Sequence, residues 1–145
     1  GGGSYQETYM ADMMQFDLVS PERRLTSTEA SAVQIPGADG DFTAMAQHAP
    51  TIATLRPGIV TVQGAGGEEK YVVTGGFAEV TPDGTTVLAE RAMPAGEVTQ
   101  DIIDDFVATA VAARDNATPE MLDQLSKQVG DIALVASELG LQSKA

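Results

Sequence analysis

A chain of 145 residues with a formal net charge of −13 excludes several classes of protein before any motif is considered. Eight Lys and Arg against 21 Asp and Glu leave no basic surface for nucleic acid, whose binding depends on neutralising phosphates. The absence of cysteine excludes disulfides and thiolate metal sites, and no apolar run approaches the ~20 residues that span a bilayer. With 43% hydrophobic residues, the chain can form one ordinary domain, or two small ones that share an interface.

The first nine residues differ in character from the rest. Gly1-Gly2-Gly3-Ser4 is typical of a flexible added linker, so we interpret residues 1–9 as a linker or tag. We expect the native chain to begin at Met10 or Met13. No charged-then-apolar signal segment opens the chain, so the sequence gives no argument for export.

From Met14 onward the pattern predicts short strands separated by turns. Met14, Phe16 and Leu18 alternate with polar residues, which is the period of a half-buried strand. Strands this short, with turn signals about every eight to twelve residues, favour a β-sandwich or a barrel. The further predicted strands are residues 32–35, 42–45, 51–55, 59–63, 70–74, 77–80 and 85–90, separated by Pro, Gly and Asp.

The pattern becomes helical after residues 93–96. Apolar residues recur at helical spacing from Ile103 to Val111, so we predict an amphipathic helix over residues 99–114. A second helix is predicted to follow Thr118 as its N-cap and to carry Pro119 in its first turn.

The second helix has the clearest periodicity in the chain. Its apolar residues are spaced three and four apart up to Leu139, which gives one narrow seam. The short connection between the helices requires them to fold back antiparallel. We therefore predict an α+β fold, with a β-sandwich domain of about ten strands over residues 13–93 and a helical hairpin over residues 98–140.

The most informative stretch runs from Gly37 to Gly58. It contains Gly37 and Gly40, the only histidine in a His-Ala-Pro triplet at 48–50, and Leu-Arg-Pro-Gly at 55–58. Val-Ser-Pro-Glu-Arg precedes it at 19–23, and Thr-Gly-Gly-Phe-Ala-Glu-Val follows it at 74–80. In this order the three motifs resemble the epsilon subunits of bacterial F-type ATP synthases, the counterparts of the mitochondrial delta subunits. The resemblance covers about residues 14–92, and the hairpin fits by its pattern alone.

The resemblance implies a non-catalytic subunit of the central stalk, the rotor that links the gamma subunit to the membrane-embedded c-ring for proton-coupled ATP synthesis. It implies a peripheral location at the cytoplasmic face of the bacterial inner membrane, without membrane insertion, and transient contact with the catalytic alpha and beta subunits. The implied c-ring contacts are Asp41, His48, Ala49 and Pro50, and the candidate gamma contacts are Val72, Phe77 and Glu79.

His48 taken alone leaves three roles open: a structural turn residue, a partner contact or a catalytic base. One histidine without cysteine argues against a zinc site. No Ser or Cys motif supplies a nucleophile with an orienting partner. We therefore expect no catalytic residue and no metal, and we rank a small hydrolase last among the alternatives.

Some bacterial relatives bind ATP on the hairpin through an Ile/Leu-Asp-x-x-Arg-Ala-x-x-Ala-x-x-Arg-Ala pattern. Ile103, Asp104, Ala108 and Arg114 match it in this chain. Val107 replaces the first arginine, which removes a charge-assisted contact to phosphate. We therefore expect no cofactor and no ATP on the hairpin. A nucleotide-sensing regulator and an unrelated β-sandwich interaction module remain the alternative functions.

The hairpin of many relatives also extends along the rotor and inhibits hydrolysis, using basic residues against an acidic partner. Here the second helix carries Lys127 as its one base, so we expect at most weak inhibition through charge. Its continuous apolar seam favours a hairpin that stays folded against the sandwich. The acids that would oppose an acidic partner are Glu120, Asp123, Asp131 and Glu138.

Overall fold

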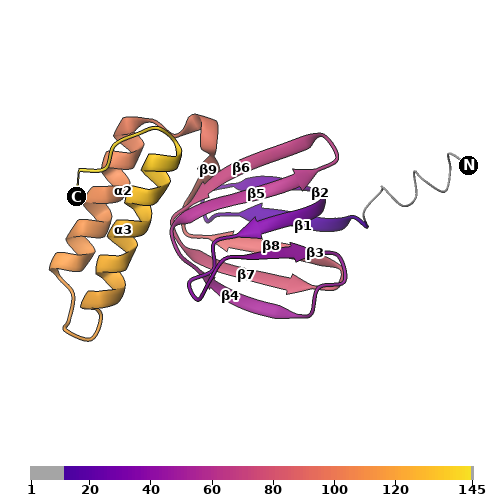
Figure 1. The fold of residues 1–145 in the computed structure, drawn as a ribbon, viewed down its shortest axis with the longest axis horizontal. Coiled ribbons are helices and arrows are strands. Elements are labelled where there is room, and N and C mark those ends of the chain that lie inside the picture. Colours follow the sequence, from indigo (N-terminus) through magenta and orange to yellow (C-terminus); the bar gives the residue numbers. More distant parts are fainter. Residues whose placement is uncertain (1–11, 145) are drawn as a thin grey trace, which may run out of the picture.

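The computed structural model describes residues 12–144, so the interpretation of residues 1–9 as a linker or tag, and a start at Met10, lie outside the described residues. Within this range a nine-stranded sheet is followed by two α-helices that lie together at one end of it (Figure 1). The predicted α+β fold, a β-sandwich followed by a helical hairpin, is confirmed. The elements are β1 (Met14–Val19), β2 (Arg24–Ile35), β3 (Phe42–Met45), β4 (Thr51–Leu55), β5 (Gly58–Gly64), β6 (Gly67–Val73), β7 (Gly76–Thr81), β8 (Gly84–Ala89), β9 (Ala92–Pro94), the 3-10 turn η1 (Ala95–Glu97), α2 (Gln100–Asp115) and α3 (Leu122–Glu138).

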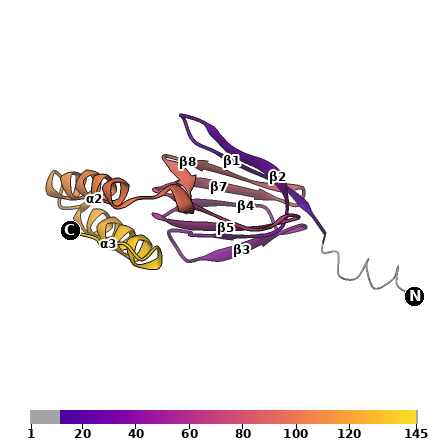
Figure 2. The same ribbon diagram turned by 90° about the horizontal axis from the view of Figure 1, so that it is seen from above.

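The long strand β2 connects the two layers of the sandwich. Its residues 24–30 pair with β1, whereas residues 32–35 pair with β3, and its register with β5 shifts between Ala30 and Ala32. Strands β4, β7, β8 and β1 therefore form one layer, and β3, β5, β6 and β9 form the other (Figures 1 and 2). The parallel pairing of β1 with β8 completes the first layer.

The core between the layers is aliphatic apart from a few aromatic rings. Alternation along β1 turns Phe16 and Leu18 inward, where both side chains are completely buried. Valines from both layers complete this core, among them Val33, Val60 and Val87. This core makes the sandwich a stiff body, because close-packed interiors resist deformation.

A second apolar cluster holds the helices against the sandwich. Ile59, Val72 and Met93 lie side by side on β5, β6 and β9, and α2 and α3 cover them. Phe106 of α2 and Ile132 of α3 are among the helical residues of this cluster. The hairpin is thus docked through its own small core, separate from the core of the sandwich.

The helix boundaries follow the predicted pattern at α2 and depart from it at α3. The side chain of Thr99 accepts a hydrogen bond from the Ile102 amide at 3.3 Å, so α2 begins one residue later than predicted. The prediction of Thr118 as the N-cap of the second helix is wrong. Residues 118–121 form a separate turn, closed by the Met121 amide on the Thr118 carbonyl at 3.0 Å, and α3 begins only at Leu122.

Two negative findings apply to residues 12–144. Neither helix combines the length and apolar character needed to cross a membrane. No group of three or more His, Cys, Asp or Glu side chains within these residues is arranged to hold a metal ion.

Candidate interaction surfaces

The His-Ala-Pro turn connects the two layers of the sandwich. β3 pairs with β2 and β4 pairs with β7, so the turn crosses from one layer to the other. Gln47 adopts a positive φ of 67° there, and its amide donates to the Pro82 carbonyl at 3.2 Å. The half-buried His48 places its Nδ1 2.7 Å from the Ala49 carbonyl oxygen. Backbone hydrogen bonds within the turn and to the β7–β8 connection therefore hold it in place, and Ala49 and Pro50 are left exposed.

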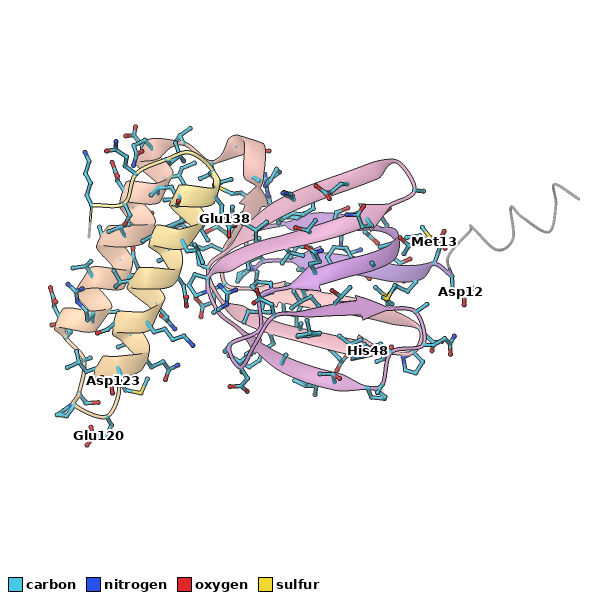
Figure 3. All side chains as sticks on the ribbon, viewed as in Figure 1. Asp12, Met13, His48, Glu120, Asp123 and Glu138 are labelled. Atoms are coloured by element: carbon cyan, nitrogen blue, oxygen red, sulfur yellow. The ribbon has the colours of Figure 1, made fainter. Side chains whose placement is uncertain are left out.

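This turn lies at the end of the sandwich that is remote from the helices. Figure 3 shows His48 at that end, together with Met13, whereas Glu120 and Asp123 mark the far tip of the hairpin. Met45, at the end of β3, is 50% exposed beside the turn. The turn is thus an accessible corner with an apolar neighbour.

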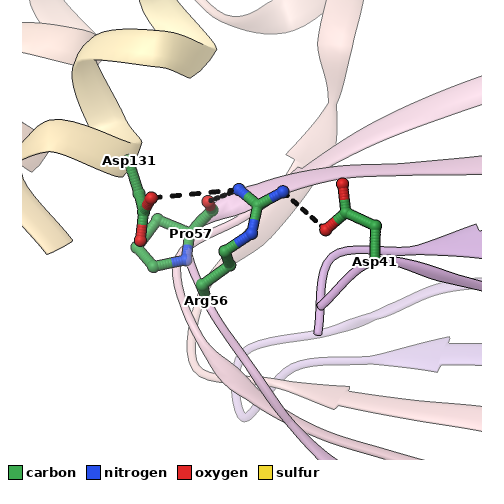
Figure 4. Close-up of polar contacts among 4 residues, drawn as sticks. All are labelled: Asp41, Arg56, Pro57 and Asp131. Carbon is green, nitrogen blue, oxygen red and sulfur yellow. Dashed lines mark hydrogen bonds and ion pairs between the residues drawn. The ribbon is translucent and has the colours of Figure 1, made fainter. Parts of the chain in front are cut away.

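Asp41 is not part of the same corner. It precedes β3 and His48 follows it, so a strand spanning about 13 Å at ~3.3 Å per residue separates them. The Asp41 carboxylate is 65% exposed and accepts a hydrogen bond from Arg56 Nη2 at 2.6 Å (Figure 4). The structure thus directs the acid and the histidine of the predicted c-ring contact to different ends of β3.

An exposed apolar patch covers the outer side of the β4, β7 and β8 layer. Phe77 pairs directly with Leu88 of β8, and Ile52 of β4 pairs with Glu79, two residues further along β7. Their side chains share one face because paired residues point to the same side of a sheet. Ile52, Phe77 and Leu88 are 75%, 56% and 53% exposed. We call these three residues the outer apolar face, and such a patch is typical of a protein contact.

The three candidate gamma contacts do not lie together. Phe77 and Glu79 belong to the outer apolar face or border it, whereas Val72 is 1% exposed beneath the hairpin. Sequence reasoning missed Ile52 and Leu88 as surface residues. Both residues alternate with more buried neighbours along β4 and β8, and this alternation could have indicated their exposure once the pairing of these strands with β7 was known.

The four residues of the nucleotide pattern are not gathered into a site. Ile103 is completely buried in the hairpin cluster, and Asp104 accepts a hydrogen bond from Gln100 at 3.0 Å. Ala108 is exposed, and Arg114 lies 3.4 Å from the carboxylate of its neighbour Asp115. Asp104 and Arg114 are about 15 Å apart along the helix at ~1.5 Å per residue. The pattern therefore lacks a common pocket for a phosphate chain.

Two arginines of the sandwich reach the helices. Arg56 Nη1 lies 4.0 Å from Asp131 Oδ1 of α3, and Arg91 Nη1 donates to Asp105 Oδ2 of α2 at 2.8 Å. Burial raises the pKa of the Asp131 carboxyl above its usual value, against the attraction of Arg56 and Lys127. The attraction of the two cations thus only partly offsets the cost of removing the Asp131 carboxylate from water.

Comparison with known proteins identifies a family match and similar solved structures. A family model described as ATP synthase, delta/epsilon chain, beta-sandwich domain, matches residues 13–95. The ATP synthase epsilon chain of Ruegeria sp. (strain TM1040) is 48% identical over 137 residues, covering 91% of this chain and 100% of that protein. The ATP synthase epsilon chain of Rhodobacter capsulatus is 50% identical over 132 residues, covering 91% and 100%.

Among solved structures, a chain of the Euglena gracilis mitochondrial ATP synthase (OSCP/F1/c-ring in rotational state 1) has a TM-score of 0.67 at 22% identity, covering 88% of this chain and 81% of that one. A chain of the Tetrahymena thermophila mitochondrial ATP synthase (central stalk/c-ring) has a TM-score of 0.54 at 15% identity, covering 82% and 98%. At these identities the two structures support the fold.

Proposed function

The chain belongs to the family of ATP synthase epsilon chains, and on this premise we propose that it is a non-catalytic rotor subunit that links the gamma subunit to the c-ring. The observation that carries the proposal is the pair of separate exposed surfaces on one stiff sandwich. The outer apolar face lies on β4, β7 and β8, and the His-Ala-Pro corner lies where β3 connects to β4. A body that transmits torque needs two such contacts and a rigid core between them.

The outer apolar face is the proposed gamma contact. Exposed aromatic side chains at the centre of an interface contribute disproportionately to affinity, which gives Phe77 the central role. Glu79, paired with Ile52 across β4 and β7, adds a charge beside the apolar patch and thereby restricts orientation. Val72 takes no part while the hairpin covers it.

The His-Ala-Pro corner is the proposed c-ring contact, with Met45 beside it. Asp41 would meet a partner from the other end of β3, and its carboxylate would exchange Arg56 for a cationic group of that partner. A ring contact places the subunit peripherally at the cytoplasmic face of the bacterial inner membrane. Contact with the catalytic subunits would be transient and would involve the hairpin.

Co-purification with the gamma subunit tests the first contact. Phe77→Asp places a charge in the outer apolar face and is expected to abolish association. Leu122→Asp is a matched control, because Leu122 is 46% exposed on α3, outside this face, and an acid suits the first turn of a helix. Retention of gamma by Phe77→Asp at the level of Leu122→Asp would contradict the proposal.

Reconstitution of the gamma subunit with the ring tests the second contact. The double variant His48→Gly with Pro50→Gly blunts the corner and is expected to weaken retention of the ring while gamma stays bound. Pro119→Gly, in the connection between the helices, serves as the control. Unchanged proton-driven ATP synthesis by the double variant would rule out the corner as the ring contact.

A further inference from the structure

Arg56 lies where three segments of the chain meet. It belongs to the short connection between β4 and β5, and its side chain is 20% exposed. Nη2 donates to Asp41 Oδ1 at 2.6 Å, while Nη1 lies 4.0 Å from Asp131 Oδ1 and donates to the Pro57 carbonyl at 3.4 Å (Figure 4). One guanidinium therefore connects the loop before β3 with helix α3.

The two carboxylates are held unequally. The contact with Asp41 is a charge-assisted hydrogen bond, whereas 4.0 Å to Asp131 exceeds hydrogen-bond distance. Yet Asp131 is the acid that more needs a partner, because its side chain is 14% exposed against 65% for Asp41. Asp41 also raises the pKa of Asp131 by repulsion, whereas Arg56 lowers it. The more exposed acid, Asp41, thus holds the cation that would stabilise the less exposed Asp131.

The hairpin can respond to this balance because its docking is local. Only the segment between Pro94 and Gln100 joins it covalently to the sandwich, and its apolar cluster is separate from the main core. An open groove of about 340 Å³ runs between α3 and the sandwich, lined in part by Arg56, Leu134 and Val135. Few apolar contacts bridge α3 and the sandwich along this groove, so polar contacts there contribute a larger share of the docking free energy.

We propose that Asp41 and Asp131 compete for Arg56, so that a cationic group of a partner that pairs with Asp41 tightens the docking of α3 on the sandwich. Once Asp41 is neutralised, the guanidinium can move from 4.0 Å to hydrogen-bond distance of Asp131. Partner binding and hairpin docking are then linked through one residue, and each favours the other. The use of this link in the assembled rotor rests on the proposed ring contact; the competition for Arg56 does not.

The experiment uses the full chain without partners, so failure of the ring contact leaves it unaffected. Asp41→Asn reproduces the neutralised state, and amide hydrogen exchange reports the opening of α3. We expect exchange in α3 to slow about two- to fivefold, the range of a single partly exposed ion pair, and the pKa of Asp131 measured by NMR to fall. Asp39→Asn removes the same charge from an exposed position in the same loop and is expected to change neither.

The role of Arg56 is decided by repeating Asp41→Asn in an Arg56→Gln background. If the two acids compete for Arg56, the gain in protection shrinks to half or less. A gain of undiminished size would show simple repulsion between the acids and overturn the proposal, as would the absence of any gain in the parent chain. Should Arg56→Gln fail to fold, Arg56→Met replaces it. Methionine keeps a flexible unbranched side chain but removes the cation for which the acids compete, so the gain must again shrink.

Discussion

Arg91, in the connection between β8 and β9, places its guanidinium 4.6 Å from the centre of the Phe106 ring of α2. Nη1 of the same group donates to Asp105, the neighbour of Phe106 on α2. Phe106 is buried in the cluster that docks the hairpin. Each helix is therefore tied to the sandwich by one arginine, Arg91 for α2 and Arg56 for α3.

Arg91→Ala is expected to weaken docking of α2. It removes a cation–π contact, an ion pair and the packing of the arginine stem, together about 1–2 kcal/mol of the free energy of local opening. Hydrogen exchange of the α2 amides measures this energy. Arg114→Ala is the control, because Arg114 pairs with Asp115 on the same helix and its loss should cost under ~0.5 kcal/mol. Equal effects of the two substitutions would contradict a docking role for Arg91.

Val72→Ala and Phe77→Ala are expected to separate stability from binding. Val72 is buried under the hairpin, so its truncation should lower the free energy of unfolding by about 2 kcal/mol. Phe77 is exposed on the outer apolar face, so its truncation should change unfolding by less than ~0.5 kcal/mol but weaken gamma association. Denaturant titration and a gamma binding assay provide the two measurements. If Val72→Ala lost gamma binding while Phe77→Ala kept it, Val72 and not Phe77 would be the gamma contact.

The docking of α3 is expected to weaken as pH rises and Asp131 ionises. Its pKa in the folded chain is raised above the ordinary value of 3.8, chiefly by burial. Its contribution to stability is therefore fully present below that value and is lost as pH rises through the folded pKa. Asp131→Asn should remove this loss and leave docking at pH 7 as strong as in the parent chain or stronger, although an ion pair is broken.

Hydrogen exchange of α3 between pH 3 and pH 7 measures this dependence. Asp123→Asn is the control, because Asp123 lies at the hairpin tip, away from the sandwich (Figure 3). If docking instead strengthened with rising pH in the parent chain but not in Asp131→Asn, the predicted destabilising effect of the Asp131 charge would be contradicted.

Two glycines should respond oppositely to alanine. Gly76 has a φ of +122°, and a Cβ there would lie 2.1 Å from the Leu88 carbonyl oxygen, so Gly76→Ala should destabilise the sandwich severely. A Cβ at Gly130, inside α3, would meet no atom within 4 Å, and Gly130→Ala should stabilise the helix by about 1 kcal/mol. Thermal unfolding distinguishes the two. A Gly76→Ala chain as stable as the parent would disprove the predicted steric conflict.

ATP is expected to leave the stability of the chain unchanged. Asp104 and Arg114 are not gathered around a pocket, and Val107 stands where the pattern has its first arginine. A ligand at a hundred times its Kd would add about 2.7 kcal/mol. Thermal melts with and without millimolar ATP measure the difference. A clear rise in melting temperature of the parent chain would establish nucleotide binding.

Local patterns predicted most strands but not their partners. Alternation located β1 and β7, and turn residues separated β5 from β6. The first half of β2 was missed because residues 26–31 are mostly small and polar. It is a strand because residues 24–30 pair with β1, and local strand propensity does not predict such a long-range pairing. The three-residue β9 likewise exists only through its pairing with β6.

The candidate contacts show the same limit. Phe77 and Glu79 alternate with buried residues, and that alternation correctly predicts an exposed face on β7. Val72 lies in the continuous apolar run at 71–73, which is typical of a strand covered on both sides. The sequence analysis did not use this signal, and the structure shows that the hairpin is the covering element. That Asp41 is paired with Arg56 and linked to α3 depends on folding distant segments together, and the sequence has no signal for it.

The parallel pairing of β1 with β8 determines when the chain can fold during synthesis. β1 leaves the ribosome before the other strands, yet its neighbour at Thr85 to Leu88 emerges some seventy residues later. Such a distant partner slows pairing, because closing the long intervening loop costs chain entropy before the contact can compensate for it. Translation must therefore pass β8 before β1 is paired on both edges, and the helices, which follow the strands, shield the strip formed by Ile59, Val72 and Met93.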